Sequence, residues 1–332
     1  MLIKQPYLLF LGDAHDQLAA KVAMGIKQWR LHHCIGQLRL PGCNADCGLP
    51  DIDIPTACAQ GARTLVIGVA NRGGVISDTW ITVLSAALEH GMDIASGLHQ
   101  RVADIPVLNA LAQKHGRALL DVRHPQKPYP VASGTKRSGK RLLTVGTDCS
   151  VGKMYTALAL EKELQKRNVS ATFRATGQTG ILISGSGVSV DAVVADFIAG
   201  AVETLTPANA ASHWDIIEGQ GSLFHPSFSG VSAGILHGAQ ADALVLCHEP
   251  TRKTLRGVEY PIPDIKACLD LHLRFARITS PHARFVGMSI NTSACNVSAA
   301  EDVLKRFSQE YDLPCVDPVR NGIGPIADVI LS

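Results

Sequence analysis

Near the middle of the chain, one segment has the residue types and spacing needed to bind phosphate. The apolar run 142–145 ends at Gly146, a short polar loop follows, and Gly152 and Lys153 lead into a helical pattern. Glycines let such a loop curl so that successive N–H groups point at an anion, and the helix N-terminus adds partial positive charge. We expect the phosphate contacts to come from these loop residues: Gly146, Thr147, Cys149, Ser150, Val151, Gly152 and Lys153.

Two features distinguish this loop from the common Walker A motif. Five residues separate Gly146 from Gly152, where the common motif has four, and Met154 stands where Ser or Thr would ligate Mg²⁺. The long spacing resembles that of dethiobiotin synthetase and related P-loop ligases. Because the hydroxyl ligand is missing, we expect a phosphorylated ligand without a metal. Lys153 is expected to face the ligand and solvent, so that its replacement would not disturb the core.

Four acid–base residues of the C-terminal half are candidates for proton transfer. Glu218 ends an apolar run beside a glycine, at a Walker B position, and we favour a general base or metal ligand over an acid that pairs with a lysine. His225 could move a proton, although a lone histidine is more often structural. Asp196 is expected in a helix over 191–205, and Asp148 must point away from phosphate, where it could orient an amine or cap the turn.

Other residues are candidates for ligand contacts. Gln178 lies in a second loop of small residues, 175–180, which is expected to approach the cofactor. Cys149 lies next to a helix N-terminus, which would lower its pKa and allow a covalent intermediate on its sulfur. Arg72, His99 and Arg101 follow predicted strands of the N-terminal half and could bind carboxylates, and the alternative is an ordinary surface position.

A basic cluster follows the strand predicted at 242–247. Arg252, Lys253 and Arg256 could meet a phosphate group of the ligand, or form a solvated basic face. Elsewhere Cys43 and Cys47 lie near His32, His33 and Cys34, where a metal site is an alternative, although the spacing is loose for a metal motif.

Composition excludes several classes of protein. The 332 residues are 46% hydrophobic with a formal net charge of +2, so nothing indicates a nucleic-acid or membrane partner. The nine scattered cysteines are typical of reduced thiols, which predicts a cytoplasmic location. We further expect a homo-oligomer that acts on a small molecule.

Alternating strand and helix signals predict two α/β domains. Buried runs such as 64–70 indicate parallel strands, and the helices between them indicate a doubly wound, Rossmann-like domain over residues 1–123. The Pro-, Gly- and Lys/Arg-containing stretch 124–140 is expected to be a linker, followed by a P-loop domain over 141–332. Ligands of such sheets bind at the carboxyl ends of the strands, so residues 146–153, 174–180 and 218–221 should converge.

Short motifs along the whole chain resemble one family. They include Gly68–Ala70, Ser96–His99 and Asp121–Arg123 in the first half, and 146–153, 175–180, 195–197 and 218–226 in the second. In this order they resemble the D-glutamate N-acetyltransferase family, which joins a Rossmann-like domain to a P-loop domain. The resemblance implies transfer of an acetyl group from acetyl-CoA, as cosubstrate, to the amino group of D-glutamate, in D-amino acid catabolism.

Two other functions remain open at this point. One is an ATP- and Mg-dependent ligase or kinase of the dethiobiotin synthetase type, and the other is a regulatory nucleotide-binding protein without chemistry. Met154 weighs against the first, because Mg²⁺–ATP needs the hydroxyl ligand whereas coenzyme A needs only anion contacts.

Overall fold

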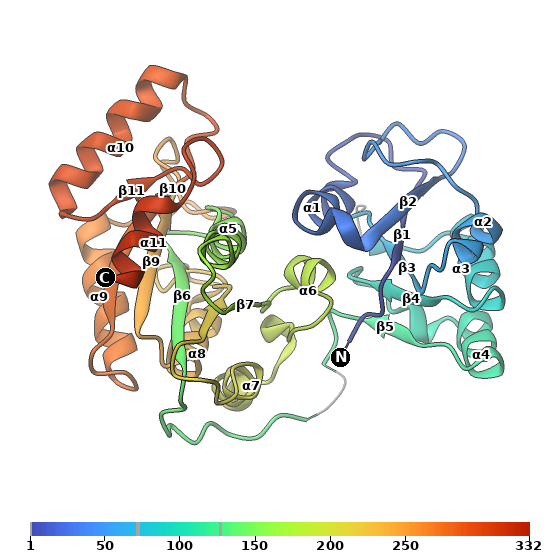
Figure 1. Cartoon of the computed structure of the whole chain (residues 1–332), viewed down its shortest axis with the longest axis horizontal. Helices are drawn as coiled ribbons and strands as arrows, with labels where there is room; N and C mark the ends of the chain where they lie inside the picture. The colour runs from blue at the N-terminus through green and yellow to red at the C-terminus, as the bar shows by residue number, and fades with distance from the viewer. Residues whose placement is uncertain (1, 71–73, 126–127) are drawn as a thin grey trace. The chain divides into compact units, whose positions relative to one another are not determined.

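The computed structural model describes residues 2–70, 74–125 and 128–332 and divides the chain into two compact units. Of these residues, unit 1 comprises 2–70, 74–125 and Gly177–Ala192, and unit 2 comprises the others. Figure 1 shows both units as sheets flanked by helices. This confirms the expected α/β class.

Unit 1 is built on a five-stranded parallel sheet of order β2-β1-β3-β4-β5. Its strands are β1 (Tyr7–Gly12), β2 (Cys34–Arg39), β3 (Thr64–Ile67), β4 (Asp93–Ser96) and β5 (Leu119–Asp121). Its helices are α1 (Lys21–Arg30), α2 (Ile54–Ala59), α3 (Asp78–Glu89), α4 (Pro106–His115) and α6 (Gln178–Ser184). β3 is buried along its whole length, as its continuous apolar run predicts.

The carboxyl end of β3 is packed directly against the start of α1. Ala23 N donates to Gly68 O at 3.0 Å, and Ala70 N donates to Ala19 O at 2.8 Å. A Cβ on Gly68 would lie 2.5 Å from Cβ of Ala23, so no space separates the two segments. Rossmann-like sheets hold dinucleotides at the switch point between neighbouring strands such as β1 and β3. In unit 1, backbone atoms occupy this switch point, and the candidate site is therefore in unit 2.

Unit 2 is built on a six-stranded parallel sheet of order β11-β10-β9-β6-β8-β7. Its strands are β6 (Lys140–Gly146), β7 (Ala171–Arg174), β8 (Trp214–Ile217), β9 (Ala243–His248), β10 (Arg284–Ile290) and β11 (Cys315–Val316). Its helices are α5 (Lys153–Lys166), α7 (Ile198–Leu205), α8 (Ser229–Ala239), α9 (Ile265–Arg277), α10 (Val297–Tyr311) and α11 (Gly324–Leu331). β6 is central, so the loop after it opens at the middle of the sheet.

Four local features differ from the sequence expectations. Cys34–Arg39 forms the edge strand β2, and Gln178 begins α6 rather than lying in a loop. The helix expected over 191–205 is two short 3₁₀ turns, Val190–Ala192 and Ala195–Phe197, before α7. Residues 177–192, assigned by sequence to the P-loop domain, pack within unit 1, where Ile3 N donates to Gly185 O at 2.7 Å.

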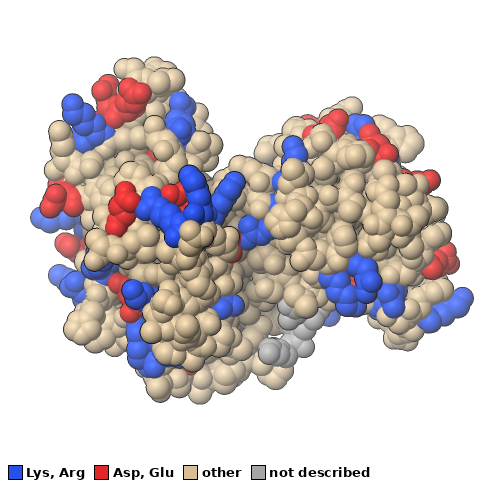
Figure 2. Space-filling model, in the orientation of Figure 1, with Lys and Arg blue, Asp and Glu red and all other residues tan. Residues whose placement is uncertain are grey.

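Charge and hydropathy agree with the composition. Figure 2 shows acidic and basic side chains interspersed over the face in view, as a formal net charge of +2 would suggest. Among the described residues, no helix combines the length and apolar character needed to cross a bilayer.

Candidate functional site

The loop between β6 and α5 has the backbone geometry of an anion cradle. Gly152 has a φ of 106°, and Ser150 takes a left-handed φ of 55°, which is unusual for a residue with a side chain. A Cβ on Gly146 would lie 2.8 Å from Cγ2 of Val151 and 3.0 Å from Nζ of Lys153. The loop therefore curls back over its own first residue. Gly146 is required by this close approach, and Gly152 is required by its positive φ.

Lys153 lies inside the loop instead of facing solvent. Its side chain is only 7% exposed, and Nζ donates to Asp148 O at 2.7 Å and to Gly221 O at 2.8 Å. Burial lowers the pKa of this ammonium, because the charged form is poorly solvated there. The expectation that Lys153 could be replaced without structural cost is therefore wrong. Its positive charge already lies within the loop, where a bound anion would compete with the two backbone carbonyls for the ammonium.

Asp148 is turned away from the interior of the loop. Its carboxylate is fully buried: Oδ1 accepts from Cys149 N at 2.7 Å, and Oδ2 accepts from Arg252 Nη1 at 2.6 Å and Arg256 N at 2.8 Å. With both oxygens engaged, the carboxylate closes the turn and neutralises a guanidinium. Of the two roles open from sequence, the geometry favours capping the turn.

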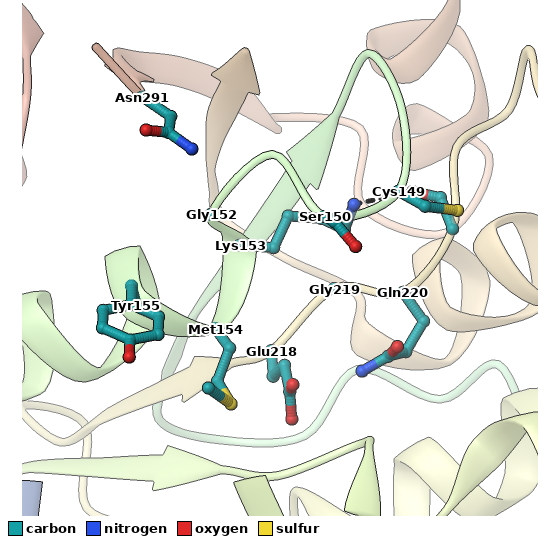
Figure 3. A pocket seen from close by; sticks show the side chains of 11 residues that line it. Cys149, Ser150, Gly152, Lys153, Met154, Tyr155, Glu218, Gly219, Gln220 and Asn291 are labelled. Carbon is teal, nitrogen blue, oxygen red and sulfur yellow. Dashed lines mark hydrogen bonds between the residues drawn. The ribbon is translucent and has the colours of Figure 1, made fainter. Parts of the chain in front are cut away.

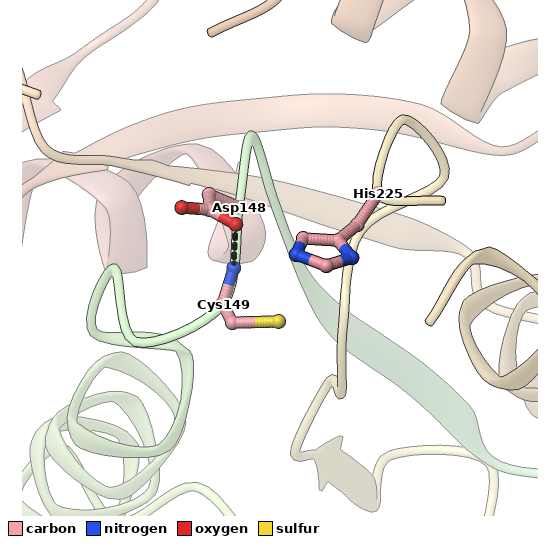
Figure 4. A group of neighbouring side chains, drawn as sticks. All are labelled: Asp148, Cys149 and His225. Carbon is pink, nitrogen blue, oxygen red and sulfur yellow. Dashed lines mark hydrogen bonds between the residues drawn. The ribbon is translucent and has the colours of Figure 1, made fainter. Parts of the chain in front are cut away.

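His225 faces the same turn from the segment after β8 (Figure 4). Nδ1 accepts from Ser227 N at 3.2 Å, which leaves the proton on Nε2, and Nε2 donates to Arg256 O at 3.0 Å. The side chain is 1% exposed. Both ring nitrogens therefore have backbone partners, which favours a structural role for His225.

Asp148, Cys149 and His225 offer ligand atoms within 4.8 Å of one another, as a metal site would require. The donors fit a cation poorly, however. The guanidinium of Arg252 lies 2.6 Å from Oδ2 of Asp148, and the His225 nitrogens are engaged with backbone groups. Cys149 is not the activated thiol expected from sequence, because burial raises its pKa even though Lys153, Arg252 and Arg256 act in the opposite direction.

Glu218 directly follows β8 and is 4% exposed. Oε2 accepts from Thr176 N at 2.9 Å, and the backbone carbonyl of Glu218 accepts from Oγ1 of Thr176 at 2.6 Å. Gly221, three residues on, accepts from Lys153. The expected convergence of the three loops at the carboxyl ends of the strands is therefore confirmed for residues 146–153, 174–176 and 218–221.

These residues border a pocket of about 460 Å³ (Figure 3). In this view Asn291 lies on one side of Lys153, and Glu218 with Gln220 lies on the other. The pocket is lined by Cys149, Ser150, Gly152, Lys153, Met154, Tyr155, Glu218, Gly219, Gln220, Gly221 and Asn291. Sequence reasoning did not select Tyr155, Gln220 or Asn291. Asn291 could have been found, because it directly follows the buried strand β10.

The remaining predicted site residues lie elsewhere. Asp196 is exposed in a 3₁₀ turn and does not border the pocket. Gln178 begins α6 in unit 1, where its side chain lies beside Gly97. His99 and Arg101 are exposed in the loop after β4, with Arg101 Nη1 at 3.7 Å from Asp104 Oδ1. Arg72 lies outside the described residues.

Comparisons with known proteins agree along the whole length. Residues 38–125 match the model of a domain of unknown function described as the DUF1611 Rossmann-like domain, and residues 130–327 match the DUF1611 P-loop domain. The crystal structure of a DUF1611 family protein from Anabaena variabilis ATCC 29413 has a TM-score of 0.83 and 32% identity to this chain, and the match covers 99% of each chain.

Two curated proteins are more similar in sequence. One from Tritonibacter scottomollicae, named D-glutamate N-acetyltransferase, is 55% identical over 332 residues, 100% of both chains. Another of the same name, from Pseudoalteromonas sp, is 50% identical over 327 residues, 98% of both chains. The chain therefore belongs to the DUF1611 family, alongside proteins named D-glutamate N-acetyltransferase.

Proposed function

We propose that this protein transfers the acetyl group of acetyl-CoA to the amino group of D-glutamate, giving N-acetyl-D-glutamate and CoA. The observation that carries the proposal is full-length identity of 55% and 50% to two proteins named for this activity. It agrees with the sequence expectation of an acyltransferase. No feature of the site favours the ligase alternative.

The pocket of unit 2 suits the phosphates of acetyl-CoA. The curled loop, the α5 N-terminus and the ammonium of Lys153 supply positive potential at one wall. Met154, also on the pocket wall, has no oxygen to offer Mg²⁺. Anion contacts of this kind need no metal, and we propose that none takes part.

We propose that Glu218 accepts the proton that the substrate ammonium must lose before its nitrogen attacks the thioester carbonyl. As the C–N bond forms, the C–S bond breaks and CoA leaves as a thiolate, which takes up the second proton that the nitrogen loses. General-base help of this kind contributes roughly 10²–10⁴ in rate. Glu218 is favoured over Asp148 and His225, whose polar atoms close the turn and bind backbone, and over Asp196, which lies outside the pocket lining. Arg72, His99 and Arg101 are proposed to bind the substrate carboxylates.

The direct test combines the purified protein with acetyl-CoA, D-glutamate and EDTA. We expect release of a free CoA thiol that depends on D-glutamate, and a product heavier than glutamate by one acetyl group in mass spectrometry. In a parallel mixture with ATP and Mg²⁺ in place of EDTA, substrate-dependent formation of ADP without CoA release would instead establish the ligase alternative.

Location and assembly remain proposals. The nine cysteines carry no disulfide, which supports a reducing, cytoplasmic environment. We also propose a homo-oligomer, which sedimentation of the purified protein would measure.

A further inference from the structure

A folded segment after β9 lies against the phosphate loop. We call residues 249–262 the strap. It is closed on itself by hydrogen bonds from Leu255 N to Tyr260 O at 2.7 Å and from Ile262 N to Lys253 O at 2.9 Å. Two arginines of the strap, Arg252 and Arg256, reach the loop, and they do so in different ways.

Arg252 is committed to holding the loop. Its Nη1 donates to Asp148 Oδ2 at 2.6 Å and Cys149 O at 2.7 Å, and its Nε lies 3.6 Å from Oε2 of Glu249. Two carboxylates therefore surround this guanidinium. By binding the carbonyl of Cys149 together with the Asp148 carboxylate, Arg252 holds this part of the loop in one conformation. It is a positioning residue.

Arg256 has a fixed backbone and an available charge. Its N–H donates to the buried Asp148 carboxylate at 2.8 Å, and its carbonyl accepts from the buried His225 ring at 3.0 Å. The side chain itself is exposed, and Nη1 donates to Oγ of Ser150. Among the residues that the structure describes, no carboxylate lies within 4.0 Å of its guanidinium.

Ser150 borders the pocket and lies in the loop itself. Through its hydrogen bond to Ser150, the exposed Arg256 guanidinium lies beside the pocket lining, without a carboxylate partner among the described residues, and Lys153 is a second cation inside the loop. Two cations at separate depths suit a ligand with more than one phosphate group. A guanidinium at the rim can bind a phosphate through two hydrogen bonds.

We propose that Arg256 binds a phosphate group of the ligand at the rim of the pocket, in addition to the phosphate held by Lys153 and the loop amides. This inference rests on the proposed function, because acetyl-CoA carries both a diphosphate and a 3′-monophosphate. It assigns ligand binding to Arg256 and loop support to Arg252, although the two lie only four residues apart.

The test is calorimetric titration in EDTA of the wild-type protein, Arg256→Ala, Arg256→Lys and the control Lys305→Ala. Lys305 is exposed on α10 and does not line the pocket, so its replacement removes an equal charge away from the site. Each protein is titrated with acetyl-CoA and with acetyl-3′-dephospho-CoA. Thermal unfolding without ligand checks that each variant folds.

We expect Arg256→Ala to weaken acetyl-CoA binding at least about tenfold, since it removes a charge-assisted contact. Arg256→Lys should lose less, and Lys305→Ala should stay within twofold. A loss seen only with acetyl-CoA assigns Arg256 to the 3′-phosphate, and an equal loss with both ligands assigns it to the diphosphate.

Unchanged affinity of folded Arg256→Ala for both ligands, with normal wild-type binding, would overturn this inference and leave the proposed function standing. Failure of the wild-type protein to bind acetyl-CoA would overturn both.

Discussion

Lys153 connects two parts of the site that are far apart in sequence. Its ammonium bridges the loop carbonyl of Asp148 and the carbonyl of Gly221. In the absence of ligand these bonds compensate a buried charge, and an anion in the loop would replace or supplement them. The Gly-Lys motif predicts the lysine, but its second partner lies 68 residues further along the chain.

At the same scale, Glu218 is the residue on which the proposed chemistry depends. Glu218→Gln keeps the shape and an oxygen that can accept from Thr176 N, but it removes the base. We expect turnover to fall at least about a hundredfold with acetyl-CoA affinity nearly unchanged. The loss should shrink at high pH, where more of the substrate amine is already deprotonated. Steady-state rates and calorimetry measure the two effects.

Glu301→Gln is the matched control, because Glu301 is exposed on α10 and should give wild-type turnover. If Glu218→Gln keeps turnover within a few fold of wild type, Glu218 is not the base.

At the scale of elements, β8 and β6 must approach closely for the site to form. Gly219 N donates to Oγ1 of Thr144 at 3.0 Å, and a Cβ on Gly219 would lie 1.8 Å from Thr144 O. The obstacle is backbone of a central strand, which cannot move aside at low cost. The segment from Glu218 to Gly221 therefore reaches Lys153 only because residue 219 has no side chain.

Gly219→Ala should accordingly destabilise the protein by several kcal/mol, about 3 or more, and weaken acetyl-CoA binding in whatever fraction folds. Gly230→Ala on α8 is the control, since nothing lies within 4 Å of its added Cβ, and it should be neutral or slightly stabilising. Denaturant unfolding of the two variants compares them. Equal stability of Gly219→Ala and wild type would contradict the packing described here.

The elements differ in how well the sequence predicts them. Continuous apolar runs predict β3 and β6, because burial on both faces leaves a strong local signal. The edge strand β2 was not predicted, because its half-exposed positions leave only a weak local signal in the sequence. α6 was read as a loop of small residues, and its packing on unit 1, where Ile183 lies near Gly25, involves contacts distant in sequence.

The candidate site likewise has parts that the local sequence predicts and parts that it does not. The loop, Lys153 and Glu218 follow from local pattern, since strand, glycine and helix signals are contiguous. Other properties depend on partners up to 108 residues away, which no local pattern specifies. They are the burial of Lys153, the tautomer of His225 and the different roles of Arg252 and Arg256.

At the scale of the whole molecule, buried neutral histidines determine the response to acid. Burial lowers the pKa of His248 and of His272 from 6.5 to about 4. The unfolded chain takes up these protons near pH 6.5 and the folded chain only near pH 4, so stability is complete above pH 6.5 and falls as pH decreases toward 4. Each histidine contributes up to about 3 kcal/mol over this window.

His248→Asn should therefore flatten the dependence of unfolding free energy on pH between 6.5 and 4. Exposed His282→Asn should leave the dependence as in the wild type. Urea unfolding at several pH values measures both, and an unchanged slope in His248→Asn would show that His248 titrates normally in the folded protein.

The central claim is that acetyl-CoA binds through the phosphate loop without a metal. Calorimetric titration of acetyl-CoA in EDTA tests this most directly. Wild-type protein should bind, and Lys153→Met, which keeps an apolar stem of similar length, should lose most of the affinity. That variant should also unfold at a lower temperature without ligand, because Asp148 O and Gly221 O lose their donor. Wild-type binding that requires Mg²⁺ and ATP, or full acetyl-CoA affinity in folded Lys153→Met, would contradict the account.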